Sequence, residues 1–261
     1  MTINMAKQTK IVDPDRMPQA VFVLSDLHAH IDGPWHRHYR VQLVHVSEGV
    51  LTVVTRSARF VIPPQRAVWI ASGVEHRIEA RCPFLLSTCY IEPALVAIQD
   101  ASRVVAVDRL TDELLVAASQ FSVGYAPDGP EARIVAVLLD RLPTLQATDI
   151  SLPEPSDNRL RRITDVLLAQ PATTDSLAQL AGRAAMTERT AARLFLRDTG
   201  LTFGQWRQHL RLQVALESLG AGASVTEAAF DVGYQDVSSF IAAFKMRFGT
   251  TPAKALQREA Q

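Results

Sequence analysis

The feature that most constrains this chain is an internal duplication near its C-terminal end. Residues 176–200 align with residues 224–249 when both segments are anchored at their final glycine, so that Phe195 falls on Phe244. The turn of the second copy has one extra residue, and with a gap at that position the alignment continues toward the start of both segments. Because a segment that repeats at this length encodes one supersecondary unit, each copy is predicted to form a short helix, a tight turn and a second helix that ends at glycine.

The second copy carries the clearest local signals. Ser224 and Glu227 form a capping-box pattern, and Gly233 allows the positive φ that a sharp turn needs. Gly249 is placed to end the second helix in a left-handed conformation, and the Thr-Pro pair at 251–252 predicts the start of a further helix. An apolar stripe at i, i+4 and i+8 anchors the second helix and consists of Phe240, Phe244 and Phe248.

A helix that is anchored by its back face can place its front face in the major groove of DNA, which is about 12 Å wide. In the first copy the front-face residues are Thr187, Glu188, Arg189, Arg193 and Arg197. In the second copy they are Gln235, Asp236, Ser238, Ser239 and Lys245. Arginine reads guanine edges or clamps phosphates, so the first copy is expected to carry more of the sequence specificity. A solvated arginine face is the alternative for an isolated helix, and the repeat favours the DNA interpretation.

Charge is divided unevenly along the chain. Lys+Arg and Asp+Glu both total 27 over the whole sequence. From Arg159 onward there are 13 basic and 9 acidic residues, a net charge of +4, and the preceding residues carry a net charge of −4. A basic C-terminal part suits contact with a polyanion, although such an excess is also common among domains that never touch DNA.

Between the two copies, residues 202–219 read as one long helix that would connect them rigidly. Residues 160–256 resemble the C-terminal domain of the AraC/XylS family of bacterial regulators, and the string SVTEAAFDVGYQDVSSFIAAFKMRFGTTP is similar to that family's signature in the second motif. The resemblance implies two helix-turn-helix motifs in one chain, each placing its second helix in successive major grooves. Phe203 stands where the first repeat of the family often carries proline.

The N-terminal part has a different pattern, in which short apolar and β-branched runs between residues 20 and 92 are separated by turn residues. This spacing is typical of a small antiparallel sandwich or barrel. Residues 112–121 and 131–142 have helical spacing, and their apolar stripes could pack on the β-domain or form a dimer seam. The predicted domains are a sensor at 18–92, a helical segment at 93–142, a linker at 143–157 and a DNA-binding domain at 158–257.

Six of the seven histidines lie within the first 76 residues. His36, His38 and Gln42 would share one face of a strand, and His76 opens a later strand. With Gly49 and with the G-x-x-H at 73–76, this pattern resembles the two cupin motifs. That resemblance implies that His36, His38, Gln42 and His76 surround a divalent metal ion. The sequence departs from the cupin pattern because Gln42 replaces the acid, Ala71 the usual proline and Ala80 the usual asparagine.

Three interpretations of these histidines stay open. Imidazoles with an amide oxygen could hold Zn²⁺, Ni²⁺ or Fe²⁺, although the missing carboxylate removes charge compensation. A metal-free pocket could hydrogen-bond an effector, or the histidines could be satisfied structural residues. Cys82 and Cys89 are not expected to form a disulfide, because on one strand they would project from opposite faces.

The predicted fold is an α+β multidomain chain, with an N-terminal cupin-like β-barrel or sandwich and a C-terminal all-α tandem helix-turn-helix domain. The predicted function is a ligand-responsive regulator of transcription that binds double-stranded DNA and a small-molecule effector as a homodimer. A metal-dependent cupin enzyme with a helical appendage and a DNA-architectural module are the alternatives. No nucleophile–base pair or phosphate-binding glycine loop is recognisable, so no catalytic residue is expected. The absence of a signal peptide or a long apolar run predicts a cytoplasmic protein without a membrane partner.

Overall fold

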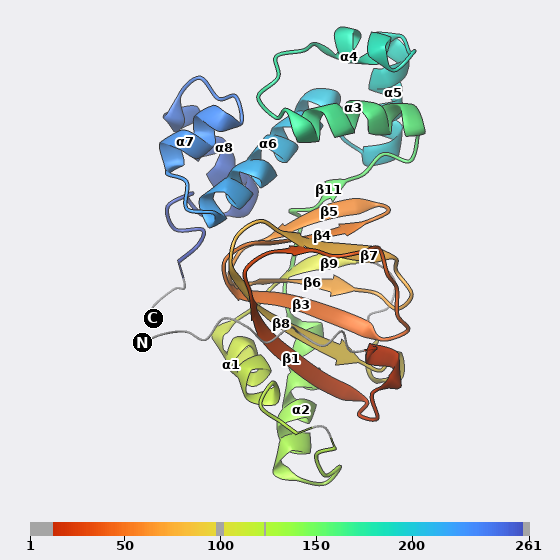
Figure 1. Cartoon of the computed structure of the whole chain (residues 1–261), viewed down its shortest axis with the longest axis vertical. Coiled ribbons are helices and arrows are strands. Elements are labelled where there is room, and N and C mark those ends of the chain that lie inside the picture. The colour runs from red at the N-terminus through yellow and green to blue at the C-terminus, as the bar shows by residue number, and fades with distance from the viewer. Residues whose placement is uncertain (1–12, 98–101, 123, 258–261) are drawn as a thin grey trace.

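A computed structural model describes residues 13–97, 102–122 and 124–257 of the chain. It consists of an N-terminal β-sandwich, two helices on one side of the sandwich and a helical C-terminal domain on the opposite side (Figure 1). This arrangement confirms the predicted α+β fold. Among the residues described, no helix is both long enough and apolar enough to cross a membrane.

The sandwich is built from two antiparallel sheets. Sheet A has the strand order β1 (Val21–His28), β8 (Phe84–Ile91), β3 (Val41–Glu48), β6 (Arg66–Ile70), β9 (Arg103–Ala106) and β10 (Ala147–Thr148). Sheet B has the order β11 (Leu152–Pro153), β5 (Ala58–Ile62), β4 (Leu51–Thr55), β7 (His76–Ala80) and β2 (Ile31–Asp32). The predicted apolar runs all lie on these strands, and β9 extends the sheet beyond residue 92, into the segment predicted as helical.

Alternation along β3 explains how sheet A is covered on both faces. Val44 and Val46 are buried in the core between the sheets, whereas Val41 and Leu43 belong to a second core that includes α1 (Arg109–Ala118) and α2 (Pro130–Arg141). The two helices begin at residues 109 and 130, earlier than their apolar stripes suggest. Asp108 caps α1 by accepting a hydrogen bond from the amide of Thr111, and the sequence analysis overlooked this signal.

The C-terminal domain contains both predicted helix-turn-helix units. Its helices are α3 (Asn158–Ala169), α4 (Leu177–Arg183), α5 (Glu188–Thr199), α6 (Phe203–Gly220), α7 (Val225–Asp231) and α8 (Val237–Phe248). Gly200 and Gly249 end α5 and α8 in the left-handed conformation, at φ 70° and 76°. The helix predicted from residue 251 is wrong, because within the described residues the chain there forms turns held by bonds such as Ala255 N–H to Thr251 O.

The segment predicted as a linker, 143–157, does join the two parts, but it is folded onto them. Its strand β10 pairs with β9 and its strand β11 pairs with β5, so it closes one edge of each sheet. Ile150 and Leu152 are fully buried. Trp206 of α6 donates its indole N–H to Pro153 O at 2.7 Å. The prolines of this segment are the basis for predicting a linker, and its isolated apolar residues pack it against both parts.

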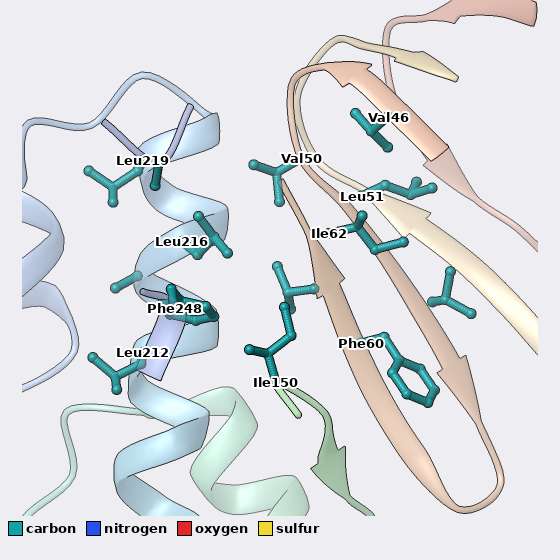
Figure 2. Packing of buried hydrophobic residues seen from close by; sticks show 14 of the residues in the cluster. Val46, Val50, Leu51, Phe60, Ile62, Ile150, Leu212, Leu216, Leu219 and Phe248 are labelled. Carbon is teal, nitrogen blue, oxygen red and sulfur yellow. The ribbon is translucent and has the colours of Figure 1, made fainter. Parts of the chain in front are cut away.

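The sandwich and the C-terminal domain share a hydrophobic core (Figure 2). Leu216 of α6 points toward sheet B, and Val50, just before β4, lies opposite it (Figure 2). Leu212, Leu219 and Leu51 belong to the same cluster. The cluster also includes Phe240, Phe244 and Phe248 of α8. At Gly220 the helix approaches so closely that an added Cβ would lie 2.4 Å from Val50 Cγ2.

Polar contacts surround this interdomain core. Glu217 of α6 accepts hydrogen bonds from Thr52 and from Arg59, whose Nη2 lies 2.6 Å from Oε1 of Glu217. Arg59 also pairs with Glu79 of β7 at 3.3 Å. The buried amide of Gln213 donates to Ile150 O and Arg59 O. We call Thr52, Arg59, Glu79, Gln213 and Glu217 the interdomain polar cluster.

Candidate functional site

The first recognition helix, α5, shows the predicted division into a buried and an exposed face. Ala191, Leu194 and Phe195 are buried in the core of the first copy. Arg189 and Arg193 are exposed, and among the described residues neither has an ion-pair partner. Thr187 caps the helix by accepting from Thr190 N–H, and Glu188 lies exposed in its first turn. Two free guanidinium groups therefore project from the outer face of α5.

Arg197 differs from the other two arginines on α5. Its Nη2 lies 2.7 Å from Oδ1 of Asp198. Asp198 also accepts bonds from the Ser156 amide and hydroxyl, and hydrogen bonds from Arg197 and Ser156 hold the pKa of Asp198 down to about 2. The side chain of Arg197 is therefore tied to the point where the chain enters α3, and its place is at the rim of the recognition face.

The exposed face of the second recognition helix, α8, carries fewer charged side chains than that of α5. Gln235, Asp236, Ser238, Ser239 and Lys245 are all exposed, as predicted. Asp236 caps α8 through a hydrogen bond from Ser239 N–H to its carboxylate at 2.7 Å. Its back face is a stack of phenylalanines, with ring centroids 5.6 Å apart for Phe240 and Phe244 and 4.5 Å apart for Phe244 and Phe248.

The predicted histidine site is assembled by the sandwich. A bridge in which each backbone N–H bonds the opposite carbonyl at 2.9 Å joins His36 to His76. His38 completes the cluster, and one ring nitrogen from each of the three histidines lies within 4.8 Å of the others. His38 and His76 are buried whereas His36 is exposed, so the cluster opens to solvent on the side of His36.

The protonation of these rings follows from their backbone contacts. Each Nδ1 faces a carbonyl oxygen: His36 faces Pro34 O at 3.0 Å, His38 faces Arg40 O at 2.7 Å and His76 faces Val74 O at 2.8 Å. A carbonyl only accepts hydrogen bonds, so each Nδ1 carries a proton, and in the neutral ring Nε2 then presents a lone pair. This is the arrangement that orients metal-binding histidines in proteins. Burial lowers the pKa of His38, and it lowers the pKa of His76 to about 4, which keeps both rings neutral at pH 7.

Gln42 lies at the inner side of this cluster. Its Oε1 is 3.2 Å from His38 Nε2, while its Nε2 donates to the Thr88 hydroxyl at 2.9 Å and the Tyr90 hydroxyl at 3.2 Å. The amide oxygen and the imidazole lone pair are both acceptors, so a cation between them would satisfy both. The Nε2 of His76 is buried and has no hydrogen-bond partner among the described residues. The donor set therefore fits a divalent transition-metal ion.

Rotation of the Gln42 amide by 180° would satisfy the same atoms without a cation. The NH₂ group would then donate to His38 Nε2, and the hydroxyls of Thr88 and Tyr90 would donate to the amide oxygen. That state leaves His76 Nε2 unsatisfied. Thr88 and Tyr90 were missed by the sequence analysis, although both are polar residues on the inward-facing side of the apolar strand β8.

His45 lies outside the site, on the opposite face of β3 from Gln42. It projects to the other face of sheet A, where its Nε2 lies 2.9 Å from Asp112 of α1 and its Nδ1 lies 3.0 Å from Arg66 O. Cys82 and Cys89 are both buried free thiols.

Known proteins match both parts of the chain. Residues 21–112 match the AraC-like ligand binding domain family, and residues 180–258 match a family described as a helix-turn-helix domain. The HTH-type transcriptional regulator NimR of Escherichia coli is 33% identical over 249 residues, which is 94% of this chain and 91% of NimR. The HTH-type transcriptional regulator RipA of Corynebacterium glutamicum is 33% identical over 146 residues, 56% of this chain and 40% of RipA. The solved structure of ToxT from Vibrio cholerae is 10% identical, covers 91% of this chain and 98% of ToxT, and has a TM-score of 0.41.

Proposed function

This chain belongs to the AraC family of helix-turn-helix transcription regulators, and on that premise we propose that α5 and α8 read successive major grooves of one operator. The observation that supports the proposal is that both recognition helices have a buried back face and an exposed polar front face, and that the 18-residue helix α6 joins them. Such a helix is about 27 Å long, against the roughly 34–36 Å that separate successive grooves on one side of DNA.

The two recognition helices contribute unequally to base recognition. Arg189 and Arg193 can each form a bidentate contact with guanine, which discriminates against a wrong base by about 1–3 kcal/mol. Arg197 is held by Asp198 and is assigned to phosphate anchoring. At the start of α8, Gln235, Ser238 and Ser239 offer single polar contacts, and Lys245 farther along the helix offers a phosphate contact. The carboxylate of Asp236 caps the N-terminus of α8.

A base-substitution scan of the operator, with the full chain and a salt series, tests this division. Losses should concentrate under α5, and Arg193→Ala should reduce specificity at one base position about tenfold or more. Lys245→Ala should weaken binding to all sequences alike and flatten the salt dependence. Losses concentrated under α8 would contradict the ranking. A chain that shows no sequence preference at any salt concentration would contradict the whole proposal.

The histidine site is proposed as the sensing site, with His36, His38 and His76 binding Zn²⁺, Ni²⁺ or Fe²⁺ through Nε2 and Gln42 adding an amide oxygen. The metal would supply a positive charge that no carboxylate in this ligand set neutralises, so it would attract an anionic effector from the solvent side. The unsatisfied Nε2 of His76 is the observation that favours a metal over a metal-free effector pocket.

Metal content measured on protein that was purified without chelators tests this assignment. Binding of one equivalent should be lost in His76→Ala, whereas His45→Ala should keep the metal, because His45 lies on the opposite face of β3. Gln42→Leu should weaken binding about tenfold or more. Wild-type protein that binds none of the three ions would leave the metal-free effector pocket as the assignment.

The relatives are transcription regulators, which supports a non-enzymatic, cytoplasmic role.

A homodimer is proposed from apolar side chains on the outer faces of α1 and α2. Leu110 is 53% and Val137 is 46% exposed. Replacement of both residues by glutamate should give a monomer in analytical ultracentrifugation, and an unchanged sedimentation coefficient would contradict this dimer face.

A further inference from the structure

Arg211, at the middle of α6, makes hydrogen bonds both to the loop that leads into the first helix-turn-helix unit and to the turn inside the second. Its Nε donates to Pro171 O at 2.8 Å and its Nη2 donates to Thr173 O at 3.0 Å, both in the loop from α3 into α4, the first helix of the first copy. Its Nη1 lies 3.5 Å from Gly233 O, in the turn between α7 and α8 of the second copy. A planar guanidinium can bridge several carbonyls in this way because its five N–H donors have fixed directions.

The two backbones that Arg211 bridges are also in close contact with each other. Gly233 has a φ of +86°, and a Cβ there would lie 2.9 Å from Arg211 Nη2 and 3.0 Å from the Cα of Ala172. Only glycine therefore fits between the turn of the second copy and the loop of the first. Tyr234, the next residue, packs edge to face on Phe240 with ring centroids 5.3 Å apart, so the turn is fixed to the core of its own copy.

From this geometry we propose that Arg211 sets the rotation and separation of the two recognition helices, and so determines the operator spacing that the protein accepts. The inference rests on the proposed binding of both copies to one operator. One base pair shifts a half-site by about 3.4 Å and about 35° around the DNA axis. Helix α6 fixes the distance between the copies, and the Arg211 bridge, which joins backbone to backbone at Pro171, Thr173 and Gly233, fixes their relative rotation.

The preferred two-part site is first selected from a random duplex library with the wild-type full chain. Affinity is then measured for duplexes in which the two parts are moved closer or farther apart by one or two base pairs. The affinity as a function of this separation is the spacing profile. The wild type should lose about tenfold or more in affinity for each base pair of change, because one copy then disengages. Arg211→Met should bind all spacings within about threefold of one another. Its affinity for a duplex that carries only one half-site should equal that of the wild type.

The matched control is Arg207→Met, one turn earlier on α6. Arg207 donates to Asp175 O at 3.0 Å and stacks on Phe203 at 4.9 Å, so in the part of the chain that the structure describes its bonds reach the entry to the first copy and the start of α6, but not the second copy. Its variant should keep the spacing profile of the wild type. Arg211→Lys keeps the positive charge but lacks the guanidinium fork that bridges the three carbonyls. If Arg211→Met does not fold, the spacing profile of Arg211→Lys is measured in its place.

Two results would overturn the inference. One is an unchanged spacing profile in both Arg211 variants, and the other is an equal loss on single half-sites, which would indicate that Arg211 only supports the fold of each copy. If the wild type itself selects no two-part site, the proposed use of both copies fails instead, so the two failures can be told apart.

Discussion

The two helix-turn-helix copies share a plan but differ in what they are attached to. The first copy has a core of its own, built from α3, α4, α5 and the start of α6, and from the sandwich side it receives Leu152 of the joining segment. In the second copy, Phe240, Phe244 and Phe248 belong to the same core as Val50, Leu51 and Phe60 of the sandwich (Figure 2). A change in the sandwich can therefore act directly on the second copy, whereas it reaches the first copy through α6 and through the joining segment 143–157.

This difference suggests how an effector signal could travel. Strand β7 carries His76 of the histidine site at one end and Glu79 of the interdomain polar cluster near the other. Glu79 binds Arg59, and Arg59 binds Glu217 of α6. Effector binding and DNA binding would then be linked reciprocally, with each changing the affinity for the other by the same factor.

The largest expected effect comes from the equivalent phenylalanines Phe195 and Phe244, both fully buried. Replacement of either by alanine should lower the free energy of unfolding by about 3–5 kcal/mol. Hydrogen exchange should show that Phe195→Ala exposes the amides of the first copy alone. Phe244→Ala should also increase exchange in β4 and β5, because they share its core. Equal exchange in β4 and β5 for both variants would remove the proposed difference in attachment.

A smaller effect is expected for Glu217→Gln in the interdomain polar cluster. Arg59 would lose its ion pair with Glu217 and keep the one with Glu79. The loss of a charged hydrogen bond should cost about 1.5–3 kcal/mol. The sandwich and the second copy should be destabilised together in calorimetry, while the first copy keeps its own transition. Glu188→Gln, on the exposed start of α5, is the control and should leave both transitions unchanged.

The smallest changes in the free energy of unfolding are expected for alanine substitutions of the glycines at the two ends of α6. Gly204, near the first copy, has open space around it, so Gly204→Ala should stabilise the chain by about 0.4–1 kcal/mol. Gly220→Ala would press on Val50 and should cost about 1–3 kcal/mol. Thermal unfolding of the two variants compares them directly. A stabilised Gly220→Ala protein would mean that α6 does not rest on the sandwich as described.

Much of the fold was predictable because its signals are local. Apolar alternation located the strands, and the cap at Ser224 and the glycine at 249 located the helices of the second copy. The contacts between the domains had no such signal. Gln213 and Glu217 appear in the sequence only as polar residues on a long helix, and their partners Ile150 and Arg59 are remote in the chain.

The histidine site was predictable in its ligands but not in its surroundings. The even spacing of His36, His38 and Gln42 placed them on one face, and His76 followed from the cupin resemblance. The bonds that fix the ring nitrogens go to backbone carbonyls, which leave no trace in side-chain identity. The contact of Gln42 with Tyr90 depends on the pairing register of β3 and β8, which the sequence alone does not determine.

The joining segment has a consequence for solubility. Strands β10 and β11 are the outermost strands at one side of sheets A and B, and Pro153 in β11 cannot donate a backbone hydrogen bond to a further strand. Removal of the chain from residue 147 onward would uncover the unpaired backbone of β9 and β5 together, and such edges template aggregation. A fragment that contains only the sandwich and its two helices should therefore extend through Pro153. A fragment that stops at residue 142 would expose the unpaired edges of both sheets.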